Sequence, residues 1–355
     1  MTLRRLYRSA LGHIPRPLRE IVASIDYRMA SRPVLYHDPQ LHPQGRLTRG
    51  AVTISLDFEL AWGSLYSRRA GQNFLQFGLR EREQMPRILS ALDEFHIPAT
   101  WATVGHLFLE KCSAGSDGMA HHGMPRIQPF ENERWIFQGG DWFQFDPCTD
   151  VRRDPAWYAP DLIEMVLASK ENHELGCHSF SHPSFGQNCP RSVAEAEVEA
   201  CTQAMAPYGL KPTSWVFPRH EEGNFEALAA KGIGIVRSFP GPGSCISLPV
   251  LRPDGMWGVH VSSAVDRGLD WSFDQRLKRL QGFVDAAADQ RLGAHIWLHP
   301  SLSEDEINRV FKPFLRYCAA RRDEGTIDAL TMEQLVGATQ NAAAREGQKK
   351  EAIHG

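Results

Sequence analysis

The chain has 355 residues, of which 42% are hydrophobic and 23% charged, and its formal net charge is −3 at pH 7. This length suits one large α/β barrel or two ordinary domains, and the composition is that of a globular protein with a buried core. The near-neutral charge gives no basic field for nucleic acid and no acidic run of the kind seen in disordered tails. We therefore expect no nucleic-acid partner.

The N-terminal residues contain arginines, but no apolar stretch of signal-peptide length follows them, and no window approaches the length of a transmembrane helix. We expect residues 1–50 to form a helical arm packed on the domain, with contact to a membrane surface as the alternative. The seven cysteines lack CxxC spacing and are interpreted as reduced thiols. These features predict a cytoplasmic protein with no integral membrane segment.

From residue 51 onward, short apolar runs alternate with helical stretches, which indicates a parallel sheet. About seven strands predict an α/β fold closed into a TIM-like barrel over residues 51–339. Ser192 is the expected N-cap of the third helix. The expected strands are 51–57, 99–104, 174–178, 213–217, 233–237, 257–261 and 293–298, and the expected helices are 79–95, 160–171, 191–207, 223–232, 272–291 and 303–322.

Two segments interrupt this alternation. Residues 113–150 are rich in Gly, His, Pro and Trp without a clear period, and we expect them to form a long loop over one end of the barrel. Loops of this length in a compact domain are usually functional or disordered. Residues 340–355 are expected to form a frayed polar tail.

Candidate metal ligands occur in two distant segments, SLDFEL at 55–60 and GCHSFSHP at 176–183. Alternation along a strand places Asp57 and Glu59 on one face, where one could bind metal and the other act as a base. His178 ends a strand, and a turn after it would bring His182 close enough for chelation. A carboxylate and two imidazoles are the minimum for a catalytic divalent metal, so this pattern predicts a metal-dependent hydrolase.

A second pair with the same spacing, His295 and His299, lies within a probable strand, where four residues span about 13 Å, too far for one metal. Two further polar residues follow strands: Arg219, whose guanidinium could hold a carboxylate in a fork, and His299. The carboxyl ends of barrel strands gather at one mouth. The residues expected to converge there are Asp57, Glu59, His178, His182, Arg219 and His299.

The order SLDFEL, HSFSH, FPRHEEGN and WLHP resembles the polysaccharide deacetylase (NodB-homology) family over roughly residues 50–335. The resemblance implies a distorted (β/α)7-type barrel and a divalent metal, usually zinc, that activates water to remove acetyl from an N-acetylated sugar. Asp57 matches the family's general base. Phe58 occupies the place of the usual second Asp, which marks a divergent member, and Glu59 is the expected substitute ligand. Whether Asp57 or Glu59 binds the metal stays open.

By the same resemblance, His178 and His182 match the two metal-binding histidines. Arg219 resembles the arginine that orients the base, although the usual Arg-x-Pro order is replaced by Pro218-Arg219. His299 matches the expected general acid, which would protonate the departing amine.

The resemblance implies a carbohydrate substrate. Trp135 and Trp142 could stack on sugar rings, and the substrate-binding candidates are Trp62, Trp142 and Asn224. The leading hypothesis is a deacetylase acting on an amino sugar of a surface polysaccharide or its precursor. The alternatives are a metal-dependent amidohydrolase acting on a small cyclic or acyclic amide and a non-catalytic carbohydrate-binding relative. The sequence leaves the oligomeric state open.

Overall fold

The structure is a computed structural model that describes Ala23, Tyr27 and residues 33–37, 45–239, 245–266, 268 and 271–354. The predicted helical arm, residues 1–50, lies mostly outside the described residues. Within it, β1 (Val34–Leu35) pairs in parallel with β9 (Cys245–Ile246). The expected domain limits at residues 50 and 339 stay a prediction.

A ten-stranded sheet curls around the core in the order β10-β11-β8-β7-β6-β3-β2-β13-β12, with β14 also beside β2. Every pairing is parallel except that of β10 with β11. All seven expected strands are present, and the predicted distorted barrel of the α/β class is confirmed. The strands are β2 (Gly50–Phe58), β3 (Thr100–Thr103), β6 (Glu174–Cys177), β7 (Ser214–Val216), β8 (Ile235–Ser238), β10 (Val250–Leu251), β11 (Trp257–His260), β12 (Ser263–Ala264), β13 (Gly293–Leu298) and β14 (Ile327–Ala329).

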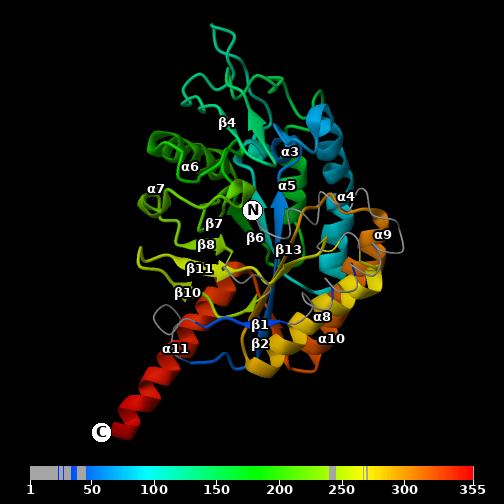
Figure 1. The fold of residues 1–355 in the computed structure, drawn as a ribbon, viewed down its shortest axis with the longest axis vertical. Helices are drawn as coiled ribbons and strands as arrows, with labels where there is room; N and C mark the ends of the chain where they lie inside the picture. The colour runs from blue at the N-terminus through cyan, green and yellow to red at the C-terminus, as the bar shows by residue number, and fades with distance from the viewer. Residues whose placement is uncertain are drawn as a thin grey trace.

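Along the chain the helices alternate with these strands, as predicted, and in space they flank the sheet (Figure 1). The expected helix 303–322 is divided by a π-helical turn, Ile307–Phe311. Among the described residues, no helix combines the length and the hydrophobicity of a transmembrane span. The α-helices are α3 (Ala61–Ser64), α4 (Phe74–Phe95), α5 (Pro160–Leu167), α6 (Arg191–Met205), α7 (Phe225–Ala230), α8 (Phe273–Gln290), α9 (Glu304–Glu306), α10 (Lys312–Asp323) and α11 (Met332–His354).

Two local predictions about the helices are wrong. Ser192 does not cap α6, because the helix already begins at Arg191 and the cap position is Pro190, which has no side chain that can accept a hydrogen bond. The tail is not frayed, because α11 continues to His354. In Figure 1 this last part of α11 projects away from the sheet.

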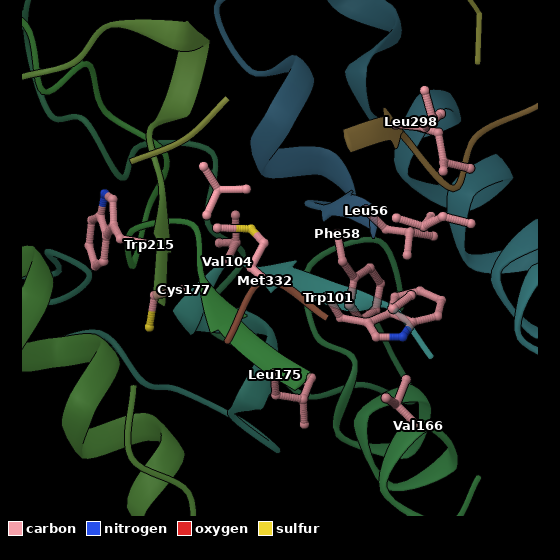
Figure 2. Close-up of a cluster of buried hydrophobic side chains, with 14 of the residues drawn as sticks. Leu56, Phe58, Trp101, Val104, Val166, Leu175, Cys177, Trp215, Leu298 and Met332 are labelled. Atoms are coloured by element: carbon pink, nitrogen blue, oxygen red, sulfur yellow. The ribbon is translucent and has the colours of Figure 1, made fainter. Parts of the chain in front are cut away.

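Strand β2 organises the core, because all nine of its residues are buried and it pairs with β3, β13 and β14. Figure 2 shows Leu56 and Phe58 of β2 near Trp101 of β3 and Leu298 of β13. The rings of Phe58 and Trp101 meet edge to face with centroids 6.1 Å apart. Both faces of β2 are buried: apolar side chains alternate along it with Thr53, Ser55 and Asp57, which are buried as well.

Residues 113–150, here called the cap segment, contain a short hairpin of β4 (Phe130–Glu131) and β5 (Ile136–Phe137) within otherwise irregular chain. A bridge between Lys111 and Asp150 closes the segment at its base. Figure 1 shows β4 beyond one end of the sheet, on the same side as α3, which follows the carboxyl end of β2. The cap segment therefore lies over the end of the barrel where the strand-end residues gather.

The two sides of α4 offer a direct test of the core. Leu92 is fully buried, whereas Leu79 on the same helix is 45% exposed. Leu92→Ala should lower the free energy of unfolding by about 2–5 kcal/mol, because it leaves a cavity in the core. Leu79→Ala, the matched control, should change it by no more than ~0.5 kcal/mol. Equal losses in urea unfolding would contradict this packing.

Candidate active site

The carboxylate of Glu59 meets the imidazoles of His178 and His182. Glu59 lies directly after β2, and its Oε1 is 2.8 Å from Nε2 of His178 and 3.2 Å from Nε2 of His182. All three side chains are buried. The turn after β6 achieves this with a left-handed backbone at Ser179 (φ 60°) and His182 (φ 63°), a strained arrangement that is common at functional sites. The predicted spacing argument for these ligands therefore agrees with their placement.

The hydrogen bonds of His178 identify the nitrogen that faces Glu59. Nδ1 of His178 lies 2.8 Å from the carbonyl oxygen of Val216, which can only accept, so Nδ1 carries the proton. In the neutral ring, Nε2 then presents its lone pair to the carboxylate, which is also an acceptor. Burial lowers the pKa of the neighbouring His182 to about 4, so this ring is neutral at pH 7. Two acceptors in contact require a proton or a cation between them, and this donor set fits a divalent metal.

Two further residues leave room for the Glu59 side chain and fix the backbone that carries it. A Cβ atom on Gly63, in α3, would overlap the Glu59 carboxylate, so only glycine fits there. Oε1 of Glu81, on α4, accepts hydrogen bonds from the backbone N–H groups of Glu59 (2.7 Å) and Leu60 (3.2 Å). Burial raises the pKa of Glu81 to about 8, so near neutral pH it holds the turn largely without adding a second negative charge.

Asp57 is paired with Arg237 of β8 and not with Arg219. Both terminal nitrogens of Arg237 donate to the Asp57 carboxylate, one of them at 2.6 Å, and both side chains are buried. Burial alone would raise the pKa of Asp57, but the charge of Arg237 leaves it lower than usual. Arg237 also donates to Oγ of Ser55 at 3.1 Å, which His295 contacts at 2.8 Å. Asp57 is therefore a fixed, ionised carboxylate.

Arg219 occupies a different place from the one predicted. Its Nε donates to the carbonyl oxygen of His182 at 3.3 Å, and its guanidinium carbon lies 4.1 Å from the ring centroid of Trp135 and 5.0 Å from that of Phe130. Its two terminal nitrogens are buried and have no hydrogen-bond partner among the described residues. The prediction that Arg219 holds Asp57 is wrong, because Arg237 of β8 holds both oxygens of Asp57. Arg219 instead links the His182 turn to the cap segment.

His299 stands at the edge of the same group. It follows β13, its Nε2 lies 3.8 Å from Oε2 of Glu59, and its side chain is 37% exposed. One ligand atom each from Asp57, Glu59 and His299 lies within 4.8 Å of the others. Burial lowers the pKa of His299, but the carboxylates of Glu59 and Asp57 outweigh this, and the net shift is upward. A raised pKa favours the protonated imidazolium, the form that a general acid needs.

The predicted substrate-binding residues are placed differently. Trp62 and Trp142 are fully buried, and Nε1 of Trp142 donates to Oγ of Ser181 at 3.0 Å. Asn224 donates to the backbone carbonyl oxygens of Phe185 (3.3 Å) and Cys189 (3.1 Å). The full burial of Trp62 and Trp142 argues against contact with a sugar, whereas a substrate-binding role for the partly buried Asn224 stays a prediction.

Several important residues escaped the sequence analysis. Arg237 has a visible signal, a charged residue at the end of an apolar strand, but nothing in the sequence names its partner. Glu197 lies within α6 and looks like an ordinary helical acid. Its carboxylate nevertheless accepts from the N–H groups of Phe180 and Ser181, both at 2.8 Å, and so holds the turn between the two metal-ligand candidates.

Removal of Arg237 tests the buried ion pair. Arg237→Met leaves Asp57 charged and unpaired in the core, so the free energy of unfolding should fall by about 3–5 kcal/mol. Arg191→Met is the control, because Arg191 pairs with Glu195 on the surface, where the two side chains are 61% and 48% exposed. It should change stability little. Similar losses for both variants in urea unfolding would contradict the buried pairing.

Residues 71–233 match the family model for polysaccharide deacetylase. The matched range contains His178, His182 and Arg219, whereas Asp57, Glu59 and His299 lie outside it. A search of curated proteins found no match.

Three solved structures share the fold. A Mycobacterium smegmatis protein assigned as a polysaccharide deacetylase has a TM-score of 0.58 at 14% identity and covers 88% of this chain and 95% of its own. A Pseudomonas aeruginosa PAO1 protein with the same assignment has a TM-score of 0.54 at 12% identity, with coverages of 81% and 90%. Puue allantoinase has a TM-score of 0.54 at 13% identity, with coverages of 81% and 89%. At these identities the likeness shows the fold alone.

The family match agrees with the motif order and with the barrel that carries it. Residues 71–233 match the polysaccharide deacetylase family, whose members are hydrolases acting on carbon–nitrogen bonds other than peptide bonds.

Proposed function

We propose that the protein removes the N-acetyl group from an amino sugar of a surface polysaccharide or its precursor, with a divalent metal, Zn²⁺, as cofactor. The observation that supports this most strongly is the contact of Glu59 with both His178 and His182 at the mouth of the barrel. Nitrogen and carboxylate ligands of this kind suit catalytic zinc, which keeps an open position for water or substrate.

Glu59, His178 and His182 would hold the metal, and Glu59 is favoured over Asp57 because Arg237 already occupies both oxygens of Asp57. The metal would polarise the acetyl carbonyl and make the attacking water more acidic. The carbonyl oxygen of Val216 keeps the proton of His178 on Nδ1, so that Nε2 faces the site.

Proton transfers are assigned to Asp57 and His299. Arg237 keeps Asp57 ionised and fixes its direction, so Asp57 can accept the proton of the attacking water. His299, charged by its carboxylate neighbours and partly open to solvent, can donate to the departing amine, which is otherwise a poor leaving group. Both groups lie within reach of the Glu59 carboxylate.

A sugar ring would meet a different aromatic group from the one expected. Trp297 is only partly buried, and its ring centroid lies 5.1 Å from that of His299 and 6.4 Å from that of Phe239. The Phe239 side chain is 39% exposed. Aromatic faces beside the general acid suit the apolar face of a pyranose.

A second candidate is hydrolysis of a small cyclic or acyclic amide by the same residues. It is kept because the allantoinase structure matches the fold as well as the Pseudomonas aeruginosa protein does. Metal analysis combined with two assays separates the candidates: acetate release from N-acetylglucosamine oligomers or nucleotide sugars, and ring opening of allantoin. Activity on neither, with no metal bound, would favour a non-catalytic carbohydrate-binding relative. The cytoplasmic location expected from the sequence stays a prediction.

Loss of the imidazole ligands tests the metal site. His178→Ala and His182→Ala should each remove one equivalent of metal per chain and abolish acetate release, while circular dichroism stays that of the wild type. His96→Ala is the control, because the His96 side chain is 66% exposed and remote in sequence from the site. Undiminished metal in a His178→Ala/His182→Ala double variant would rule out this ligand set.

The role of His299 is tested by changing the leaving group. His299→Ala should lower the rate of N-acetyl hydrolysis by about 10²–10⁴-fold with metal content unchanged. Acetate esters of phenols need less protonation and should lose much less. Equal losses for amide and ester, together with a lower melting temperature, would instead indicate a packing role.

A further inference from the structure

A second group of metal-ligand side chains lies apart from Glu59 and its histidines. It consists of His106 in the 3₁₀ turn after β3, Cys112 just before the cap segment, and His121 and Asp146 within that segment. One ligand atom from each of the four lies within 4.8 Å of all the others. None of these residues takes part in the proposed reaction.

The distances suit a small tetrahedral ion. Oδ2 of Asp146 lies 3.0 Å from Nε2 of His106, 2.8 Å from Nε2 of His121 and 3.4 Å from Sγ of Cys112. Bonds of about 2.0–2.3 Å to a tetrahedral zinc ion place neighbouring ligand atoms roughly 3.4 Å apart. Only small movements of the side chains would therefore be needed.

The hydrogen bonds of His106 show, as those of His178 do, which ring nitrogen faces the possible metal position. Nδ1 of His106 lies 3.1 Å from the carbonyl oxygen of Trp157, so Nδ1 is the protonated nitrogen. Nε2 of His106 then faces Oδ2 of Asp146, which can only accept, so a second proton or a cation must lie between them. A backbone carbonyl behind the imidazole is the usual outer partner of a metal-binding histidine.

The other oxygen of Asp146 is already satisfied. Oδ1 accepts hydrogen bonds from the hydroxyl of Tyr158 at 3.1 Å and from the backbone N–H of Cys148 at 3.0 Å. Oδ2 of Asp146 faces His106, Cys112 and His121. The side chains of His106 and Asp146 are 0% exposed and that of His121 is 12% exposed. Cys112 is partly buried, and four protein ligands in a largely buried setting are typical of a structural metal.

We propose that His106, Cys112, His121 and Asp146 bind a structural zinc ion that fastens the cap segment to the barrel. Thiolate and imidazole ligands together favour zinc over the hard cations magnesium and calcium.

Such an ion would act on the active site through packing. The rings of His106 and His121 both contact Phe180, with centroids 5.5 Å and 5.2 Å away, and Phe180 lies between His178 and His182 in the chain. The ion is thus a positioning element for the turn that carries the two catalytic metal ligands. The inference is independent of the substrate proposed above.

Cobalt substitution distinguishes the two sites, because only the second contains a sulfur ligand. The full-length protein, stripped of metal and reloaded with Co²⁺, should show a thiolate-to-cobalt charge-transfer band in the near ultraviolet. Cys112→Ser should abolish this band, and Cys189→Ser, which changes a partly buried cysteine outside the group, should retain it. Zinc content should fall from two equivalents to one in Cys112→Ser and, independently, in the His178→Ala/His182→Ala double variant.

The band should persist in that double variant, so a failed catalytic site and a failed second site give different results. The cobalt band of the double variant also tests whether the second site binds metal if Cys112→Ser does not fold. The proposal is overturned if the reloaded wild-type protein shows no thiolate-to-cobalt band, or if Cys112→Ser keeps it. Thiol counting that finds Cys112 and Cys148 joined in a disulfide would overturn it as well.

Discussion

The buried carboxylate of Glu59 is the feature around which the site is built. A charge removed from water at the mouth of a barrel is costly unless positive or hydrogen-bonding groups surround it. His178 and His182 face one of its oxygens and His299 approaches the other. The nearby Glu81 is largely neutral near neutral pH, so it adds no full negative charge to those of Glu59 and Asp57. A cation among these ligands would satisfy the carboxylate and both imidazoles at once.

The motif resemblance implies one arginine, Arg219, that orients Asp57, but the structure has two arginines with different partners. Arg237, near the carboxyl end of β8, holds Asp57 with both terminal nitrogens. Arg219 lies against the rings of Trp135 and Phe130 and holds the backbone of the His182 turn. One arginine therefore fixes a catalytic carboxylate, and the other fixes a loop to the cap segment.

The cap segment contacts the turn that carries the metal-ligand candidates and contributes residues to the second ligand group. Trp142 donates a hydrogen bond to Ser181, and the ring centroid of Trp135 lies 6.1 Å from that of His182. Asp146 lies close to two histidines and a cysteine. The segment has little regular structure of its own, so its shape must come from these contacts. The buried His106–Asp146 contact lies at its attachment to the barrel, where a bound ion would restrict its movement most.

The sequence alone predicts the seven core strands, the barrel and the meeting of Glu59, His178, His182 and His299, because apolar periodicity is a local property and strand–helix alternation implies parallel strands whose carboxyl ends share one mouth. It could not determine that Arg237 pairs with Asp57 or that Trp62 is buried. Those facts depend on which strands become neighbours and on how a long segment without periodicity folds back. The second metal group has the same origin: its four ligands follow no motif spacing, and only the tertiary structure brings them within reach of one another.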